Sequence, residues 1–327
     1  MLSIKCFGAM LLISAFSMLV QAQDTQWLTP NRDTSYSTRS DYHKIIKKYP
    51  YARIVPDSSR KDVVEKRNLV YRNINGHQLH IDAFRPVAKG DRPAILIIHG
   101  GGWRSGDRSQ HIPLAQHLAA AGYVCFTVQY RLSTEALFPA AVQDLKAAVR
   151  WIRKNARQYQ VDTSKIVALG FSAGGQLAAL IGVTSGSTEF EGKVERKSPS
   201  SRVQAVIDID GTLSFVHPEA WETQNPEKVN ASVYWMGYKR NENLDLWKAA
   251  SPLTYAEKNR TPFLFLNSSI ERMHAGRDDF QAIARKNGVA VEVKTFEGSP
   301  HSFCLYDPWF IPTVAEIKGF LSRILVQ

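Results

Sequence analysis

Short apolar runs alternate along the chain with longer segments in which apolar residues recur every three or four positions. The run at 94–98 is apolar throughout, as is typical of a strand with both faces buried. Apolar residues between Val142 and Ile152 instead have helical spacing, after a proline at position 139. Strands that alternate with helices predict an α/β fold in which a mostly parallel sheet carries helices on both faces. The predicted strands are 69–74, 79–84, 94–98, 124–130, 166–169, 203–209, 262–266 and 289–296, and the predicted helices are 114–121, one that begins at 139, and 314–325.

Two segments depart from this alternation. Residues 23–60 are polar and are predicted to form an N-terminal extension with one short helix, ahead of a single α/β domain at 61–327. Residues 213–255 follow the strand at 203–209 and are rich in Trp and Tyr, so we expect them to fold over the sheet as a lid segment. Asn75-Gly76, between the first two strands, is a strong hairpin signal.

The first 22 residues have the layout of a secretory signal peptide. Lys5 is followed by an uncharged stretch to Val20, and small residues surround a cleavage point after Ala22. An apolar run of this length is short for a bilayer core of about 30 Å, although an uncleaved anchor is the alternative. We therefore expect a secreted or periplasmic protein with no membrane attachment after cleavage.

The composition narrows the classes of partner. Hydrophobic residues make up 44% of the 327, which excludes a disordered chain. Lys and Arg outnumber Asp and Glu by 41 to 30, giving a net charge of +11 that would suit nucleic acid, an anionic membrane or an acidic substrate. No nucleic-acid-binding module is recognisable, and no cysteine spacing indicates a metal site. Cys125 lies in a predicted buried strand, so a small apolar role is favoured over a disulfide with Cys304.

Gly170-Phe171-Ser172-Ala173-Gly174-Gly175 follows a predicted strand and begins a predicted helix. A serine on such a tight turn projects its hydroxyl at the carboxyl edge of the sheet, and small neighbours permit the strained backbone. The helix N-terminus offers free N–H groups to an anion. This pattern predicts Ser172 as a nucleophile, with an ordinary serine in a glycine turn as the alternative.

A second glycine motif, His99-Gly100-Gly101-Gly102-Trp103, comes directly after the strand at 94–98. Consecutive glycines let backbone N–H groups point into a site without obstruction by Cβ atoms. Together with the N–H of Ala173, those of Gly101 and Gly102 are candidates for an oxyanion hole. A flexible turn or a phosphate loop is the alternative, and the absence of a following Gly-Lys-Ser/Thr argues against phosphate.

These two motifs resemble those of α/β-hydrolase esterases, in the group that spans hormone-sensitive-lipase-like enzymes and secreted acetyl or feruloyl esterases. Further similarity lies between the motifs, in Tyr130-Arg131-Leu132, Phe138-Pro139-Ala140 and Asp144. The resemblance extends from about residue 63 to the C-terminus. It implies an α/β-hydrolase fold with an eight-stranded, mostly parallel sheet and a Ser–acid–His triad in that order. His301, just past the last predicted strand, occupies the place of the family's catalytic base.

The acid of the triad is ambiguous in the sequence. The family usually carries it in a Gly-x-x-Asp turn after the seventh strand, which this chain lacks. Asp210 at the end of the strand at 203–209 is favoured, since some lipases of this fold place their acid there. Alternation along the strand points Asp208 the same way as Asp210. Asp278 and Glu271 remain as alternatives. Their non-catalytic interpretations are helix capping for Asp278 and a solvated surface charge for Glu271.

Residues 261–279 and 308–310 more loosely resemble esterase domains associated with bacterial pectin degradation. This implies removal of acetyl groups from a plant cell-wall polysaccharide, pectin or xylan, through an acyl-enzyme and with no cofactor or metal. The alternatives are a pectin methylesterase, a feruloyl esterase, a broad carboxylesterase, or a non-catalytic carbohydrate-binding protein on a hydrolase scaffold. Candidate substrate contacts are Trp103 and Trp309 for sugar stacking, Arg272 and Arg277 for a uronate carboxylate, and His274.

Overall fold

In the computed structural model, which describes residues 25, 28–29, 33–220 and 229–325, eight strands form one sheet in the order β2-β3-β5-β4-β6-β7-β8-β9. Only β3 runs antiparallel to its neighbours, so the prediction of a mostly parallel eight-stranded sheet is confirmed. The strands are β1 Arg53–Ile54, β2 Val63–Ile74, β3 His77–Pro86, β4 Arg92–Ile98, β5 Val124–Val128, β6 Val161–Phe171, β7 Ala205–Ile209, β8 Phe263–Ser268, β9 Val291–Phe296 and β10 Tyr306–Asp307.

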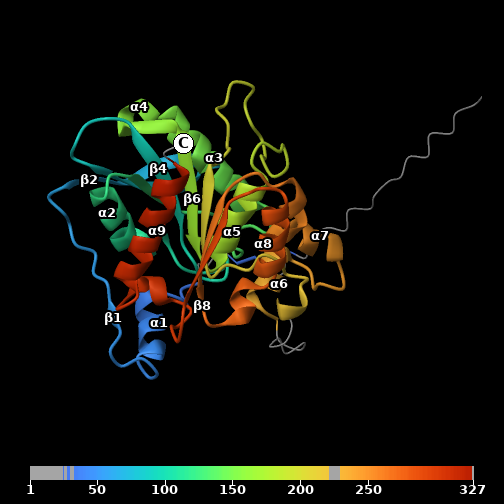
Figure 1. Ribbon diagram of the computed structural model, residues 1–327. Helices are drawn as coiled ribbons and strands as arrows, with labels where there is room; N and C mark the ends of the chain where they lie inside the picture. Colours follow the sequence, from blue (N-terminus) through green and yellow to red (C-terminus); the bar gives the residue numbers. More distant parts are fainter. Residues whose placement is uncertain (1–24, 26–27, 30–32, 221–228, 326–327) are drawn as a thin grey trace, which may run out of the picture.

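Helices cover both faces of this sheet (Figure 1). α2 and α9 lie on one face, and α3, α5 and α8 lie on the other. Successive residues of β4 point into opposite layers, because Leu96 packs with the α3 and α5 side while Ile97 packs with the α2 and α9 side. The helices are α1 Thr38–Ile45, α2 Ile112–Ala120, α3 Ala140–Lys154, α4 Ala156–Tyr159, α5 Ala173–Val183, α6 Ala231–Met236, α7 Leu244–Ala249, α8 Arg277–Lys286 and α9 Phe310–Ile324.

The hairpin expected at Asn75-Gly76 joins β2 to β3. Both turn residues have positive φ, 51° for Asn75 and 92° for Gly76, which matches the twist of the flanking strands. β2 and β3 are longer than predicted, because polar residues continue the pairing beyond the apolar runs. β6 likewise begins at Val161, five residues before the predicted start.

The extension at 33–60 packs onto the α/β domain. It carries α1 and β1, and β1 pairs with β10 through Arg53 opposite Asp307 and Ile54 opposite Tyr306. Tyr49, Ala52 and Val55 are buried in the core layer that contains α2 and α9. The extension therefore shares the hydrophobic core of the domain that follows it.

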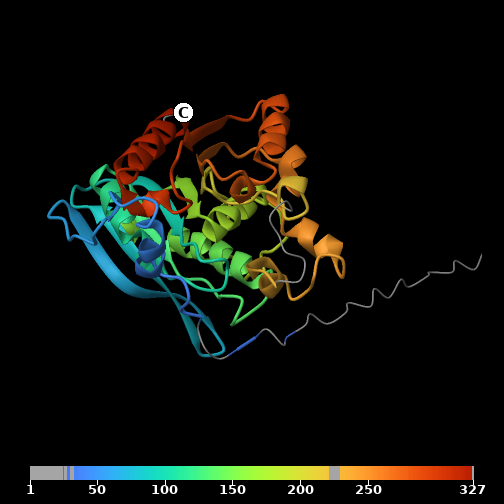
Figure 2. The same ribbon diagram turned by 90° about the horizontal axis from the view of Figure 1, so that it is seen from below.

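The lid segment (residues 213–255) contains α6 and α7. In Figure 1, α6 lies below α8 and α7 lies to the right of α8, and Figure 2 shows both helices, in yellow to orange, on the side of the molecule away from the red α9. Trp235 of α6 is fully buried and stacks on Trp103 with ring centroids 4.9 Å apart. Residues 221–228 of this segment and the signal peptide predicted for 1–22 lie outside the described residues. Within the ranges that the structure describes, no helix combines the length and apolarity needed to cross a lipid bilayer.

Both described cysteines are buried with free thiols, so the alternative of a Cys125–Cys304 disulfide is not realised. Burial raises the pKa of both thiols above the usual range. The favoured role of Cys125 as a small apolar residue agrees with its position in the core.

His111, at the start of α2, is a buried histidine from which we expect folding stability to depend on pH. It is buried, and neither ring nitrogen has a hydrogen-bond partner in the described part of the chain. Burial, together with nearby His99, lowers the pKa of His111 from 6.5 to about 3. The unfolded chain therefore binds a proton on His111 near pH 6.5, whereas the folded chain binds it only near pH 3. The contribution of the neutral His111 ring to the free energy of unfolding is thus fully present above pH 6.5 and is lost as the pH falls below that value.

We expect the free energy of unfolding to fall by up to about 1.4 kcal/mol per pH unit across this window on account of His111 alone. The His111→Phe variant, which keeps a ring against Phe171, should lose that part of the pH dependence. Urea unfolding of both proteins at pH 7.5, 6 and 5 measures the difference. Equal pH dependence in the two proteins would contradict the assignment.

Candidate active site

Ser172 lies on a sharp turn between β6 and α5. Its backbone has φ 56° and ψ −120°, a strained combination for a residue with a side chain. The turn closes because Gly170 and Gly174 have no Cβ: one on Gly170 would lie 2.0 Å from the carbonyl oxygen of Gly174, and one on Gly174 would lie 2.2 Å from that of Ile98. The glycine spacing thus places Ser172 at the carboxyl edge of the sheet and at the N-terminus of α5.

His301 lies in the loop after β9 and faces Ser172. Its Nε2 is 2.9 Å from the Ser172 hydroxyl oxygen, and its Nδ1 is 2.8 Å from Oδ2 of Asp210. The imidazole packs against the ring of Phe171, with centroids 4.9 Å apart. The three side chains form a continuous hydrogen-bonded path in which the imidazole can take a proton from the hydroxyl while the carboxylate fixes its tautomer.

Asp210 follows β7 directly and adopts φ 53°. Its carboxylate is buried, and Ser268 donates to it twice: the backbone N–H to Oδ1 (2.9 Å) and the hydroxyl to Oδ2 (2.5 Å). Asn267 supplies a longer contact of 3.4 Å. These donors hold the two carboxyl oxygens of Asp210 in place and orient the side chain toward His301.

Asp208 has a different environment, although it is only two residues away. Its Oδ1 accepts from the N–H of Gly211 at 2.8 Å, while Oδ2 has no hydrogen-bond partner among the described residues. Burial raises the pKa of Asp208 well above its usual range, which favours the neutral form of this carboxyl group. The neighbouring carboxyl groups therefore differ in their hydrogen-bond partners, and the Asp210 side chain is the one that contacts His301.

The two alternative acids do not reach His301. Asp278 is the second residue of α8, is exposed, and pairs with Arg277 at 2.8 Å, which lowers the pKa of Asp278. Glu271 is exposed in the short 3-10 helix Glu271–His274 that follows β8.

The glycine loop after β4 lies beside Ser172. Gly101 and Gly102 have φ 123° and 60°, and the N–H of Gly100 is occupied by the side chain of Gln110 at 2.8 Å. No hydrogen bond within the described chain occupies the N–H groups of Gly102 and Ala173, both of which line the pocket that contains Ser172. Gly101 does not line this pocket; its conformation serves the turn, since a Cβ there would lie 2.2 Å from the carbonyl oxygen of Ser105.

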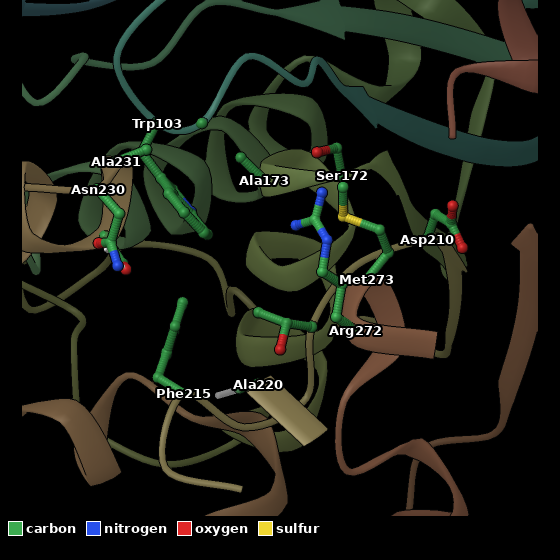
Figure 3. Close-up of a pocket in the computed structure, with 13 residues that line it drawn as sticks. Trp103, Ser172, Ala173, Asp210, Phe215, Ala220, Asn230, Ala231, Arg272 and Met273 are labelled. Carbon is green, nitrogen blue, oxygen red and sulfur yellow. Dashed lines mark hydrogen bonds between the residues drawn. The ribbon is translucent and has the colours of Figure 1, made fainter. Parts of the chain in front are cut away.

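The pocket over Ser172 has a volume of about 250 Å³ and is enclosed partly by the lid segment (Figure 3). Trp103 and Phe215 line one side of the pocket, and Met273 lines the opposite side beside Arg272 (Figure 3). The guanidinium of Arg272 points into the pocket toward Ser172 (Figure 3). The remaining lining residues are Gly102, Ala173, Asp210, Thr212, Ala220, Asn230, Ala231 and Ser232.

Of the five predicted substrate contacts, Trp103 and Arg272 line the pocket. Trp103 does not offer an open ring face: it is 8% exposed, stacks on Trp235, and its indole N–H donates to Gln176 at 2.9 Å. Its expected stacking on sugar is therefore replaced by a role in the pocket wall.

The other three predicted contacts lie elsewhere. Trp309 packs against Tyr49 and Tyr51 of the extension, with centroids 5.5 and 5.8 Å away, so its assignment to substrate is wrong. Arg277 is held by Asp278 and by the side-chain oxygen of Asn267. His274 is buried outside the pocket lining, and burial together with Arg277 lowers its pKa.

Sequence reasoning missed the residues that support His301. Asp41 of α1 accepts hydrogen bonds from the hydroxyl of Ser302, next to His301, and from that of Tyr306 at 2.9 Å. Ser268 was also missed, although its position at the end of β8, next to where the family's acid usually lies, was a signal. Nothing in the sequence indicated that Asp41, over 250 residues earlier, would reach this loop.

Known proteins share this architecture. The chain is 26% identical to "Esterase LipC" of Mycobacterium tuberculosis over 80% of this chain and 66% of that protein, and 28% identical to "Esterase LipQ" over 83% and 65%. It thus spans about two thirds of the length of these curated relatives. Among solved structures, esterase Est2 of Thermogutta terrifontis superposes with a TM-score of 0.64 at 25% identity, covering 81% of this chain and 93% of that one.

A further structure, the bifunctional GH43-CE protein of Bacteroides eggerthii, superposes with a TM-score of 0.68 at 26% identity, over 79% of this chain and 35% of that one. The expected α/β-hydrolase fold and the resemblance to esterases of that fold are confirmed. Residues 81–273, more than half of the chain, match the family described as BD-FAE. The chain therefore belongs to the BD-FAE family.

Proposed function

We propose that this protein is a serine carboxylic-ester hydrolase that removes acetyl groups from a plant cell-wall polysaccharide. The observation that carries the proposal is the hydrogen-bonded path from Ser172 through His301 to Asp210, which opens on a pocket of about 250 Å³. Relatives and structural neighbours that bear the name esterase support the reaction class.

In the proposed reaction, the Ser172 hydroxyl attacks the ester carbonyl while its proton passes to Nε2 of His301. The N–H groups of Gly102 and Ala173 stabilise the negative charge on the former carbonyl oxygen. His301 then gives the proton to the departing alcohol, which leaves an acyl-enzyme on Ser172. A water molecule, deprotonated by the same imidazole, releases the acid and restores the hydroxyl. Asp210 holds the imidazole in the required tautomer throughout.

The acyl group and the polysaccharide are proposed from the pocket and the charge. A pocket of this volume, closed by Trp103 and Phe215, suits a small acyl group such as acetyl. The net charge of +11 favours an acidic carbohydrate. The carbohydrate-esterase part of the GH43-CE protein's name supports a carbohydrate ester. Secretion is proposed from the signal-like sequence at 1–22.

Product analysis tests the proposal. Purified protein is incubated with acetylated pectin, acetylated xylan, methylated pectin and feruloylated arabinoxylan, and the release of acetate, methanol and ferulate is quantified. We expect acetate as the main product, with no release by the Ser172→Ala variant. Predominant methanol or ferulate would replace the acetyl assignment, and no release of any product would refute the esterase assignment for polysaccharides.

A further inference from the structure

Arg272 is a cation in the candidate active site that the described fold does not neutralise. It is exposed and lies in the short 3-10 helix after β8, at the carboxyl edge of the sheet. No hydrogen bond or ion pair joins it to another residue within the described ranges. Its guanidinium nevertheless points into the pocket toward Ser172 (Figure 3).

Two neighbouring arginines differ from Arg272, because their guanidinium groups are paired with other side chains of this protein. Arg277, five residues later, pairs with Asp278 and Asn267. Arg104, beside the glycine loop, pairs with Asp33 at 2.6 Å. Each of these guanidinium groups has a carboxylate partner within the chain, whereas Arg272 has none among the described residues.

Among the described lining residues, the pocket provides no free anion for Arg272. Asp210 is the only carboxylate among the described lining residues, and it is engaged by His301 and Ser268. A guanidinium presents paired N–H donors in a planar fork that matches a carboxylate, and the pairing is stronger where water is partly excluded. An anionic group of a substrate would supply the partner that this guanidinium lacks.

We propose that Arg272 selects esters of uronic acids by binding their carboxylate. The inference rests on the proposed function, because the carboxylate-bearing sugars of pectin and xylan, the two candidate polysaccharides, are uronic acids. Since the guanidinium points toward Ser172, the carboxylate belongs to the sugar that bears the scissile ester or to the next sugar. Neutral carbohydrate esters lack this contact and bind more weakly.

The test compares three esters: an acetylated methyl galacturonoside, its C6 methyl ester, and 4-nitrophenyl acetate. The first two differ in one negative charge, and the third reports on the chemical step alone. kcat and KM are measured for the wild type, Arg272→Gln and Arg272→Lys. Arg285→Gln, on the exposed face of α8, removes the same charge outside the pocket and serves as the control.

We expect the wild type to favour the galacturonoside over its methyl ester by about 10- to 100-fold in kcat/KM, the usual range for a charged hydrogen bond. Arg272→Gln should abolish this preference through KM, Arg272→Lys should keep part of it, and Arg285→Gln should keep all of it. Hydrolysis of 4-nitrophenyl acetate should be unchanged in Arg285→Gln. For the two Arg272 variants, the quantity compared is the ratio of kcat/KM between the galacturonoside and its methyl ester.

The inference is overturned if the wild type shows no preference for the galacturonoside over its methyl ester, or if Arg272→Gln retains that preference. In those cases a wild type active on the aryl ester leaves the esterase proposal standing. Inactivity of the wild type on all three esters overturns the esterase proposal itself.

Discussion

Replacement of Ser172 by alanine should lower kcat for 4-nitrophenyl acetate about 10⁶-fold, the cost of deleting the nucleophile in a serine hydrolase triad. The Ser172 hydroxyl lies 2.9 Å from His301, and no other described serine contacts this imidazole. Without that hydroxyl, only direct attack by water remains. Steady-state hydrolysis gives the loss, and mass spectrometry after treatment with an aryl phosphonate should find the adduct on Ser172 in the wild type alone.

The control is Ser322→Ala, which removes an exposed hydroxyl on α9 that bonds only within its own helix. It should retain wild-type kcat. Ser172 lies at a strained turn, so the fold of the variant has to be checked. The circular dichroism spectrum of Ser172→Ala should match that of the wild type. Retained hydrolysis by a folded Ser172→Ala protein would show that another group performs the attack.

The Asp210→Asn variant should lower kcat about 10⁴-fold with little change in fold, as happens when a triad carboxylate becomes an amide. An amide nitrogen facing Nδ1 would favour the tautomer that carries its proton on Nε2, so the imidazole could no longer accept from Ser172. Rates of 4-nitrophenyl acetate hydrolysis across the pH range measure the loss.

Asp278→Asn and Glu271→Gln provide the comparison, because each removes one negative charge from a carboxyl group that does not contact His301. Both should keep kcat near the wild-type value. A large loss in either variant, with Asp210→Asn unaffected, would transfer the role of the acid and refute the arrangement described above.

The sequence predicted the sheet and the turn around Ser172 well, because both depend on local patterns. Apolar runs identified the strands. Gly170 and Gly174 belong to the serine motif, and the turn requires glycine at both positions because a Cβ there would clash with the backbone. Strand ends were less accurate, since polar residues extend the hairpin of β2 and β3 without changing its backbone pairing.

The sequence pattern alone could not show which carboxyl group contacts His301, because this depends on how the chain turns after β7. Alternation along β7 treats Asp208 and Asp210 alike, but β7 ends at Ile209 and Asp210 turns with a positive φ toward Ser268. Trp309 was misassigned because an aromatic side chain near a site serves packing as readily as binding, and only the position of Tyr49 distinguishes the two.

The contacts of the extension also matter for protein engineering. A catalyst trimmed at residue 60, the boundary that composition suggests, would retain Ser172, Asp210 and His301 in full. It would lose Asp41, and with it the acceptor for the hydroxyls of Ser302 and Tyr306. It would also lose the strand that pairs with β10. The smallest useful version of this enzyme therefore begins before α1, and fusion partners are best separated from α1 by a linker.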